Sequence, residues 1–248
     1  MQRIPIILLF IAAGVTIGAS AQTDQLYFER ANTLYKSGQY QEAIEVYQEI
    51  LSHGTVSGEV YFNLGNACFK AGDIGHAILY YEKAKVMLED DEALEQNLKI
   101  ARLRTVDEIE PLPRLFLMEW WNTILHLFSI NTLAWITFTF FSLTLLLIML
   151  NMLRHGRLRK ILWISLSVFA AVAVIFLARV YQFETSRFGI ILTSKVSVVS
   201  EPNPAAQEIF ILHEGTRVRI NRSLENWDEI TLADGKTGWI DQQNLEEI

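Results

Sequence analysis

The 248-residue chain has a formal net charge of -7, and hydrophobic residues make up 51% of it. This hydrophobic share is above what soluble domains usually contain, so part of the chain is expected to lie in a membrane. The acidic balance argues against nucleic acid as a partner, because phosphates repel negative charge. Only segment 111–181 is basic, with 6 basic residues and 1 acidic residue.

Residues 1–21 predict a secretory signal peptide. Arg3 precedes an apolar run over 4–11, and small residues end the segment at 19–21. This order matches the basic, apolar and cleavage regions of such peptides. An uncleaved membrane anchor is the alternative, and in both cases the chain that follows begins outside the cytoplasm.

Segment 22–110 contains an internal repeat. Its small and aromatic residues recur at a 34-residue spacing, with Tyr27, Ala31, Gly38, Ala43 and Tyr47 matching Tyr61, Gly65, Gly72, Ala77 and Tyr81. Small residues let two helices approach, and glycine breaks the chain between them. The pattern resembles the tetratricopeptide repeat, with an all-α solenoid of two repeats at about 24–57 and 58–91 and a capping helix at 91–104.

This resemblance implies a binding groove, because the first helix of each tetratricopeptide repeat lines the concave face. Carried over by position, the groove residues are Phe28, Asn32, Tyr35 and Lys36 from the first repeat and Phe62, Asn66, Phe69 and Lys70 from the second. Such Asn and Lys side chains can hold a peptide backbone or a carboxylate. Alternatively, the Asn side chains only satisfy local hydrogen bonds and the Lys side chains are only solvated.

Two apolar runs, 132–153 and 161–181, predict a transmembrane hairpin. At 1.5 Å per residue each covers about 30 Å, which is the thickness of the hydrocarbon layer. The loop between them, 154–160, carries four basic residues and no acidic one. Because such loops face the cytoplasm, both flanking segments are expected outside it, in agreement with the signal peptide.

Residues 111–131 predict a linker and a helix that lies along the membrane surface. The helix is expected over 114–128, which is too short and too polar to span a bilayer. Its paired Trp120 and Trp121 suit the headgroup boundary. A soluble capping helix is the alternative.

Segment 187–248 predicts a small all-β domain. Apolar and polar residues alternate in short runs, which are interrupted at 201–204, 213–215 and 234–235. Alternation of this kind is typical of strands, and the Asp-Gly pair at 234–235 indicates a hairpin.

The end of this segment, from Trp227 through Trp239 to Leu245, resembles a bacterial Src-homology-3 (SH3) domain. It departs from the eukaryotic pattern, since no proline follows Ile240 and a leucine replaces the expected tyrosine. These departures argue against recognition of proline-rich peptides. The resemblance implies that Trp227 and Trp239 form a binding surface, and packing of Trp239 in the core is the alternative.

The sequence shows no pattern of a catalytic, cofactor or metal site. The five histidines lie in different segments, and the single Cys68 has no partner expected of a nucleophile or of a cysteine metal site. The acidic cluster at 89–92 lacks the spacing of a calcium loop. We therefore expect a protein that is not an enzyme and that holds no cofactor.

The order of the modules resembles the tetratricopeptide (BatE-type) members of the Bacteroides aerotolerance, or Bat, group. The resemblance implies a two-pass protein of the bacterial inner membrane, with both polar domains in the periplasm and membrane lipid around the hairpin. It further implies a scaffold that works with von Willebrand factor A-type Bat partners in aerotolerance or envelope stress. The alternative is an envelope sensor that binds peptidoglycan or cell-wall peptides through the SH3-like domain.

Overall fold

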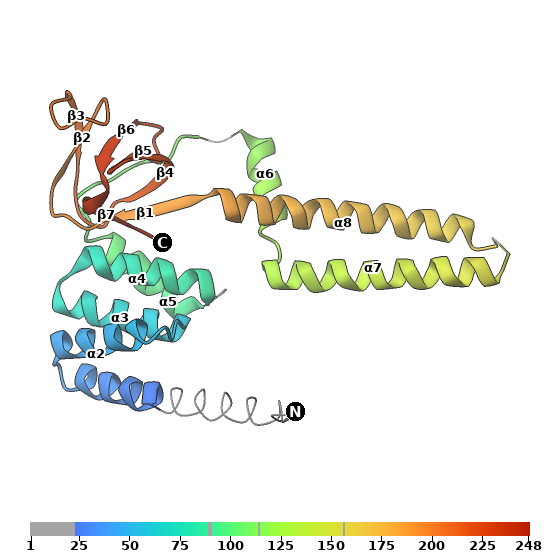
Figure 1. Cartoon of the computed structure of the whole chain (residues 1–248), viewed down its shortest axis with the longest axis horizontal. Coiled ribbons are helices and arrows are strands. Elements are labelled where there is room, and N and C mark those ends of the chain that lie inside the picture. Colours follow the sequence, from blue (N-terminus) through green and yellow to red (C-terminus); the bar gives the residue numbers. More distant parts are fainter. Residues whose placement is uncertain (1–22, 89–90, 114, 156) are drawn as a thin grey trace, which may run out of the picture. The chain divides into compact units, whose positions relative to one another are not determined.

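A computed structural model of the chain (Figure 1) describes residues 23–88, 91–113, 115–155 and 157–248. The expected signal peptide therefore lies outside the described residues. The chain divides into two compact units, Met1–Glu110 with Phe188–Ile248, and Pro111–Arg187. The expected fold class is confirmed, because the chain contains a helical repeat region, two long apolar helices and a small antiparallel sheet.

Five helices form the repeat region. They cover residues 23–36, Tyr40–Ser52 (α2), Gly58–Ala71 (α3), Ile74–Met87 (α4) and Glu92–Arg102 (α5). The side chains of Ser57, Asp73 and Asp91 each accept a hydrogen bond from a first-turn N–H of α3, α4 and α5. These caps satisfy groups that a helix start leaves unpaired. Gly72 ends α3 with a φ of 90°, a left-handed conformation that glycine adopts without strain.

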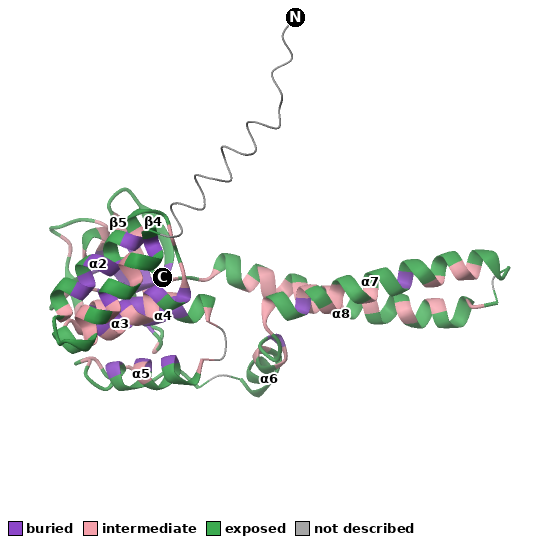
Figure 2. Cartoon of the chain, turned by 90° about the horizontal axis from the view of Figure 1, so that it is seen from below, coloured by how far each residue is buried: buried purple, intermediate pink, exposed green. Residues whose placement is uncertain are grey.

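The repeats share one hydrophobic core, which Figure 2 shows as buried bands along α2, α3 and α4. Tyr47 and Tyr81, which occupy equivalent positions of the two repeats, are among its largest fully buried side chains. A Cβ atom at Gly65 would lie 2.7 Å from the ring of Tyr81. The ring therefore occupies the space that the missing side chain leaves free, as the repeat pattern predicts.

Helix α5 corresponds in position to the first helix of a third repeat. Asn97 donates from Nδ2 to Oδ1 of Asn66 at 2.8 Å, just as Asn63 donates to Asn32 at 3.2 Å one repeat earlier. The residues equivalent to α4 are 108–121, of which 108–113 contain no helix, and the next helix, Phe116–Leu125, belongs to the second unit. The third repeat therefore lacks its second helix.

Seven strands form the C-terminal domain, which we call the β-domain. They are Arg187–Ile191 (β1), Val196–Val199 (β2), Glu208–Leu212 (β3), Arg217–Leu224 (β4), Trp227–Thr231 (β5), Thr237–Asp241 (β6) and Leu245–Glu247 (β7), with a 3-10 helix at Gln242–Asn244. The strand order is β3-β2-β6-β5-β4-β1-β7. The expected hairpin at 234–235 joins β5 to β6, which pair antiparallel.

The β-domain packs on α4 and on the segment after α5. Ile190 of β1 is fully buried within the core of the repeats. The turn before β4 lies close to α4, since a Cβ atom at Gly215 would be 2.9 Å from Cδ1 of Ile78. Asp107 accepts three hydrogen bonds of 2.7 Å, from the backbone N–H and Nδ1 of His213 and from the hydroxyl of Thr216. The two domains are therefore joined by both apolar and polar contacts.

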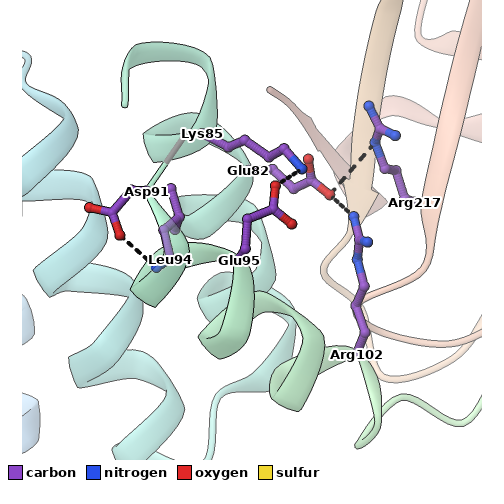
Figure 3. A network of polar contacts seen from close by, with 7 residues as sticks. All are labelled: Glu82, Lys85, Asp91, Leu94, Glu95, Arg102 and Arg217. Atoms are coloured by element: carbon purple, nitrogen blue, oxygen red, sulfur yellow. Dashed lines mark hydrogen bonds and ion pairs between the residues drawn. The ribbon is translucent and has the colours of Figure 1, made fainter. Parts of the chain in front are cut away.

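A buried carboxylate lies at the same interface (Figure 3). Glu82 of α4 is only 5% exposed and pairs with Arg102 of α5 and, at 3.8 Å, with Arg217 of β4. Beside it, Lys83 donates to Glu246 at 2.6 Å. A buried charge is tolerated when partners compensate it, so the two guanidinium groups make the burial of Glu82 possible.

The second unit consists of Phe116–Leu125 (α6), Ile130–Leu153 (α7) and Arg159–Thr185 (α8). Helices α7 and α8 are long and apolar enough to cross a membrane, and both extend beyond the runs expected from the sequence. The hydroxyl groups of Thr144 and Ser165 lie 2.8 Å apart and link the two helices. In the turn between them, Oδ1 of Asn151 accepts the N–H of Leu158 at 3.0 Å.

Candidate functional site

The expected groove residues lie on helix 23–36 and on α3. We call the surface that they share the first-helix face, and it consists of Phe28, Asn32, Tyr35, Lys36, Phe62, Asn66, Phe69 and Lys70. Phe, Asn and Lys follow one another at spacings of four in each repeat, which places them along one side of each helix. The same three residue types therefore occur at matching places in both repeats.

Both Asn side chains of this face are held by hydrogen bonds. Oδ1 of Asn32 accepts from the hydroxyl of Tyr47 at 2.6 Å and from Asn63, and Oδ1 of Asn66 accepts from Tyr81 at 2.8 Å and from Asn97. Burial raises the pKa of both tyrosines far above their usual range, so their hydroxyls remain protonated donors.

These hydrogen bonds engage the oxygen of each amide and not its nitrogen. The two carbonyl oxygens already accept two hydrogen bonds each, whereas neither Asn32 nor Asn66 donates from Nδ2 to any residue that the structure describes. A primary amide has two N–H donors, and donors with fixed direction recognise carbonyl or carboxylate oxygens. The Asn pair thus has a structural role and also keeps free donors.

The aromatic residues of the first-helix face pack on the same tyrosines. The rings of Phe28 and Tyr47 are 6.1 Å apart, and those of Phe62 and Tyr81 are 6.0 Å apart. Both phenylalanines are partly buried against the repeat core. They therefore contact the tyrosines that hold the Asn side chains, because aromatic pairs at this distance are in contact.

Three cations follow the repeat spacing along this side. Lys36 and Lys70 are exposed, and neither forms an ion pair with any described residue. Arg104, one repeat length after Lys70, places its guanidinium 4.6 Å from the ring centre of Phe69. The first-helix face is therefore basic in a chain whose net charge is -7.

The two tryptophans expected to form a surface on the β-domain differ in exposure. Trp239 is 7% exposed, and the guanidinium of Arg222 lies 5.1 Å from its ring centre. Trp227 is half-buried and pairs across the β4–β5 hairpin with the exposed Leu224. Trp239 therefore offers little of its indole to a ligand, and the available surface is centred on Trp227.

No described group has the arrangement of a metal or nucleophile site. Among the residues that the structure describes, no three His, Cys, Asp or Glu side chains gather where a metal ion fits. Burial raises the pKa of the Cys68 thiol to about 12, so the thiol is protonated at neutral pH. The chemistry visible on the repeats is therefore binding by hydrogen bonds, charge and aromatic contact.

Reasoning from the sequence missed part of this site. Asn63, Asn97 and Arg104 were not assigned to it, although each has an asparagine or a cation one repeat length away. Extending the period search from small and aromatic residues to polar ones would have found them. The hydrogen-bond partners of the Asn pair required the structure.

Comparison with known families agrees with these domains. The Tetratricopeptide repeat model matches residues 24–53 and 58–91, and the Bacterial SH3 domain model matches residues 193–247. No curated protein matched the chain. Domains of these two kinds typically bind other molecules rather than catalyse reactions, and two long apolar helices accompany them here.

Proposed function

We propose that the chain is a membrane-anchored, non-enzymatic scaffold that binds an extended segment of a partner protein on the first-helix face. One observation carries the proposal. In both repeats the Asn side chain is held through its oxygen by a buried tyrosine and a second asparagine, while its Nδ2 donates to no described residue. Two donors fixed in this way suit the acceptor groups of a peptide backbone.

The charges of the face indicate the composition of the segment. Lys36, Lys70 and Arg104 lie along the same side as the Asn pair. Cations of this kind attract carboxylates and repel basic peptides. We infer that the bound segment is extended and carries acidic side chains.

The finer assignment rests on the order of the modules. We propose a BatE-type role in the bacterial inner membrane, with von Willebrand factor A-type Bat proteins as partners and a link to aerotolerance or envelope stress. The basic residues between α7 and α8 favour a cytoplasmic turn, which leaves the repeats and the β-domain in the periplasm. Membrane anchoring itself is supported by the length and hydropathy of the two helices.

The proposal is tested with Asn32→Asp and Asn66→Asp combined in the full chain. Aspartate keeps the oxygen that accepts from Tyr47 or Tyr81 but replaces the Nδ2 donor with an acceptor. Proteins co-purified from detergent-solubilised membranes are identified by mass spectrometry. We expect at least a tenfold lower recovery of the partners of the wild type, because backbone acceptors and carboxylates then meet a negative charge.

The control adds the same charge away from this face. Gln41→Glu with Gln207→Glu changes two exposed amides outside the first-helix face and should leave recovery unchanged. If the Asn32→Asp, Asn66→Asp variant recovers the same partners in the same amounts, the first-helix face is not the binding site.

A second candidate function is favoured by the match to the Bacterial SH3 domain model. We propose as the alternative an envelope sensor whose β-domain binds peptidoglycan or cell-wall peptides around Trp227 and the exposed Leu224. The full chain in detergent is sedimented with purified cell wall, beside a Trp227→Ala variant. Equal sedimentation of both proteins, or none of either, removes this alternative.

A further inference from the structure

A basic pocket lies where the chain turns from α7 into α8. It has a volume of about 580 Å³ and is lined by Arg157, Arg159, Lys160, Ile161 and Trp163. Three of its five lining residues carry a fixed positive charge. A small ligand with negative charge therefore matches the pocket in both size and charge.

The positive charge of this pocket is not balanced within its unit. The unit contains two acidic residues, Glu119 of α6 and Glu184 near the end of α8, whereas the pocket lies at the start of α8. None of the three basic lining residues pairs with an acidic side chain among the residues that the structure describes. The pocket thus presents cations that are available to a ligand.

The other two lining residues, Ile161 and Trp163, are apolar and are exposed on the surface of α8. Trp163 is 58% exposed and Ile161 is 53% exposed. No charged residue follows Lys160 until Arg179, so the helix beyond the pocket is suited to hydrocarbon over most of its length. Tryptophan next to cations at the end of such a helix is typical of the headgroup level of a bilayer.

The start of α8 adds to the attraction for anions. Leu158 stands at the N-cap position and offers no side chain to the first-turn N–H groups. The partial positive charge of a helix start therefore remains uncompensated beside the cations of Arg159 and Lys160. Phosphate oxygens accept hydrogen bonds from both kinds of donor.

We propose that the basic pocket binds the phosphate of an anionic phospholipid, with Ile161 and Trp163 in contact with the apolar part of the same lipid. This inference rests on the membrane anchoring in the proposed function, but it holds in either orientation of the hairpin, because the pocket lies at one end of both helices. It does not depend on the first-helix face.

The test uses the full chain, freed of lipid in detergent, with dioleoylphosphatidylglycerol as the anionic probe and dioleoylphosphatidylcholine as the neutral one. Bound lipid is counted by native mass spectrometry. Each cation near an anionic lipid strengthens binding by about fivefold. We therefore expect the wild type to prefer phosphatidylglycerol, and Arg157→Gln, Arg159→Gln and Lys160→Gln together to weaken its binding by more than about tenfold.

Two further variants separate charge in the pocket from other effects. Arg157→Lys with Arg159→Lys keeps the charge and should retain affinity for phosphatidylglycerol within about threefold, because a lysine is also a phosphate ligand. Lys99→Gln, Lys195→Gln and Arg219→Gln remove three exposed cations from the other unit and should change nothing. Measurement in detergent keeps any effect of loop charge on membrane insertion out of the comparison.

Three results would overturn the proposal. The first is equal affinity of the triple glutamine variant and the wild type for phosphatidylglycerol, and the second is equal affinity of the wild type for both lipids. The third is displacement of the lipid by glycerol 3-phosphate at equal concentration, which would make this a site for soluble phosphate. Failure of the scaffold proposal can be distinguished from failure of this one, because the Asn32→Asp, Asn66→Asp variant should bind lipid like the wild type. Membrane anchoring is tested by extraction with alkaline carbonate, and release of the chain from membranes would refute it.

Discussion

The second repeat and the incomplete third repeat begin alike and end differently. Asn63 and Asn97, one repeat length apart, each donate to the Asn of the preceding helix. Asp73 and Asp107 are equivalent in the same way, but Asp73 caps α4, whereas Asp107 accepts three hydrogen bonds from the β-domain. The same repeat position can therefore bind a neighbouring helix in one repeat and a separate domain in the next.

This comparison explains how a solenoid of two and a half repeats is closed. Such arrays need a cap, because the last unit has no neighbour to cover its apolar side. Ile190 of the β-domain enters the repeat core, and Gly215 approaches Ile78 of α4. The β-domain therefore covers the side of α4 that the second helix of a complete third repeat would be expected to cover.

Removal of the Asp107 carboxylate, which contacts the β-domain, should destabilise the chain most. Asp107→Ala leaves three donors of His213 and Thr216 without their acceptor, and we expect a loss of about 2 to 4 kcal/mol in the free energy of unfolding. Asp73→Ala removes a helix cap and should cost about 1 kcal/mol. Urea unfolding of the full chain in detergent, followed by tryptophan fluorescence, measures both. If Asp107→Ala costs no more than Asp73→Ala, Asp107 does not hold the β-domain.

The second and third repeats share an Asn–Asn hydrogen bond, and its removal should have a smaller effect. Asn63→Ala and Asn97→Ala each remove one donor from a part-buried Asn carbonyl, so each should cost about 1 kcal/mol in the same unfolding experiment. The two costs should agree to within about 0.5 kcal/mol if α5 is a true first helix of a repeat. A cost for Asn63→Ala alone would contradict that assignment.

The smallest effect concerns His76, at the start of α4. The hydrogen bond to Asp73 raises the pKa of His76 despite its partial burial, and Glu246 and Glu214 of the β-domain raise it further. Because this pKa is higher in the folded chain, the stabilisation is complete below about pH 6.5 and is lost as the pH rises through the folded pKa. For a partly exposed pair we expect less than about 1 kcal/mol.

His76→Gln isolates this contribution, since the other titrating groups are the same in both proteins. The difference in unfolding free energy between wild type and variant, measured from pH 6 to pH 8, should shrink as the pH rises. A difference that grows over this range would mean that the protonated imidazole destabilises the fold.

Most of the fold follows from sequence patterns that are local or periodic. The recurrence of the repeat, the uncharged apolar runs and the Asp-Gly hairpin each depend on residues close in the chain or at fixed spacing. The docking of the β-domain does not, because Asp107 and His213 are far apart and belong to no shared period. Contacts of this kind leave no signal in a single sequence.

The candidate site was predictable to a similar extent. Repeat position identified Asn32 and Asn66. It could not show that their Oδ1 atoms already accept hydrogen bonds from Tyr47 and Tyr81, so that the Nδ2 groups remain available to a ligand. The burial of Trp239 could not be predicted in this way, because alternation within one strand does not show whether its second face is exposed or covered. Strand β6 lies between β2 and β5, and Gly238, Trp239 and Ile240 are all buried, so both of its faces are covered.

The hydrogen bond between Thr144 and Ser165 limits how the hairpin can carry information. It joins the interior of α7 to the interior of α8, and the hydroxyl of Thr144 also donates to the carbonyl oxygen of Phe140 at 2.8 Å. A piston-like slide of one helix by a turn, about 5.4 Å, would separate the pair and also pull Asn151 from Leu158. A motion that keeps both hydrogen bonds therefore tilts or shifts the two helices together.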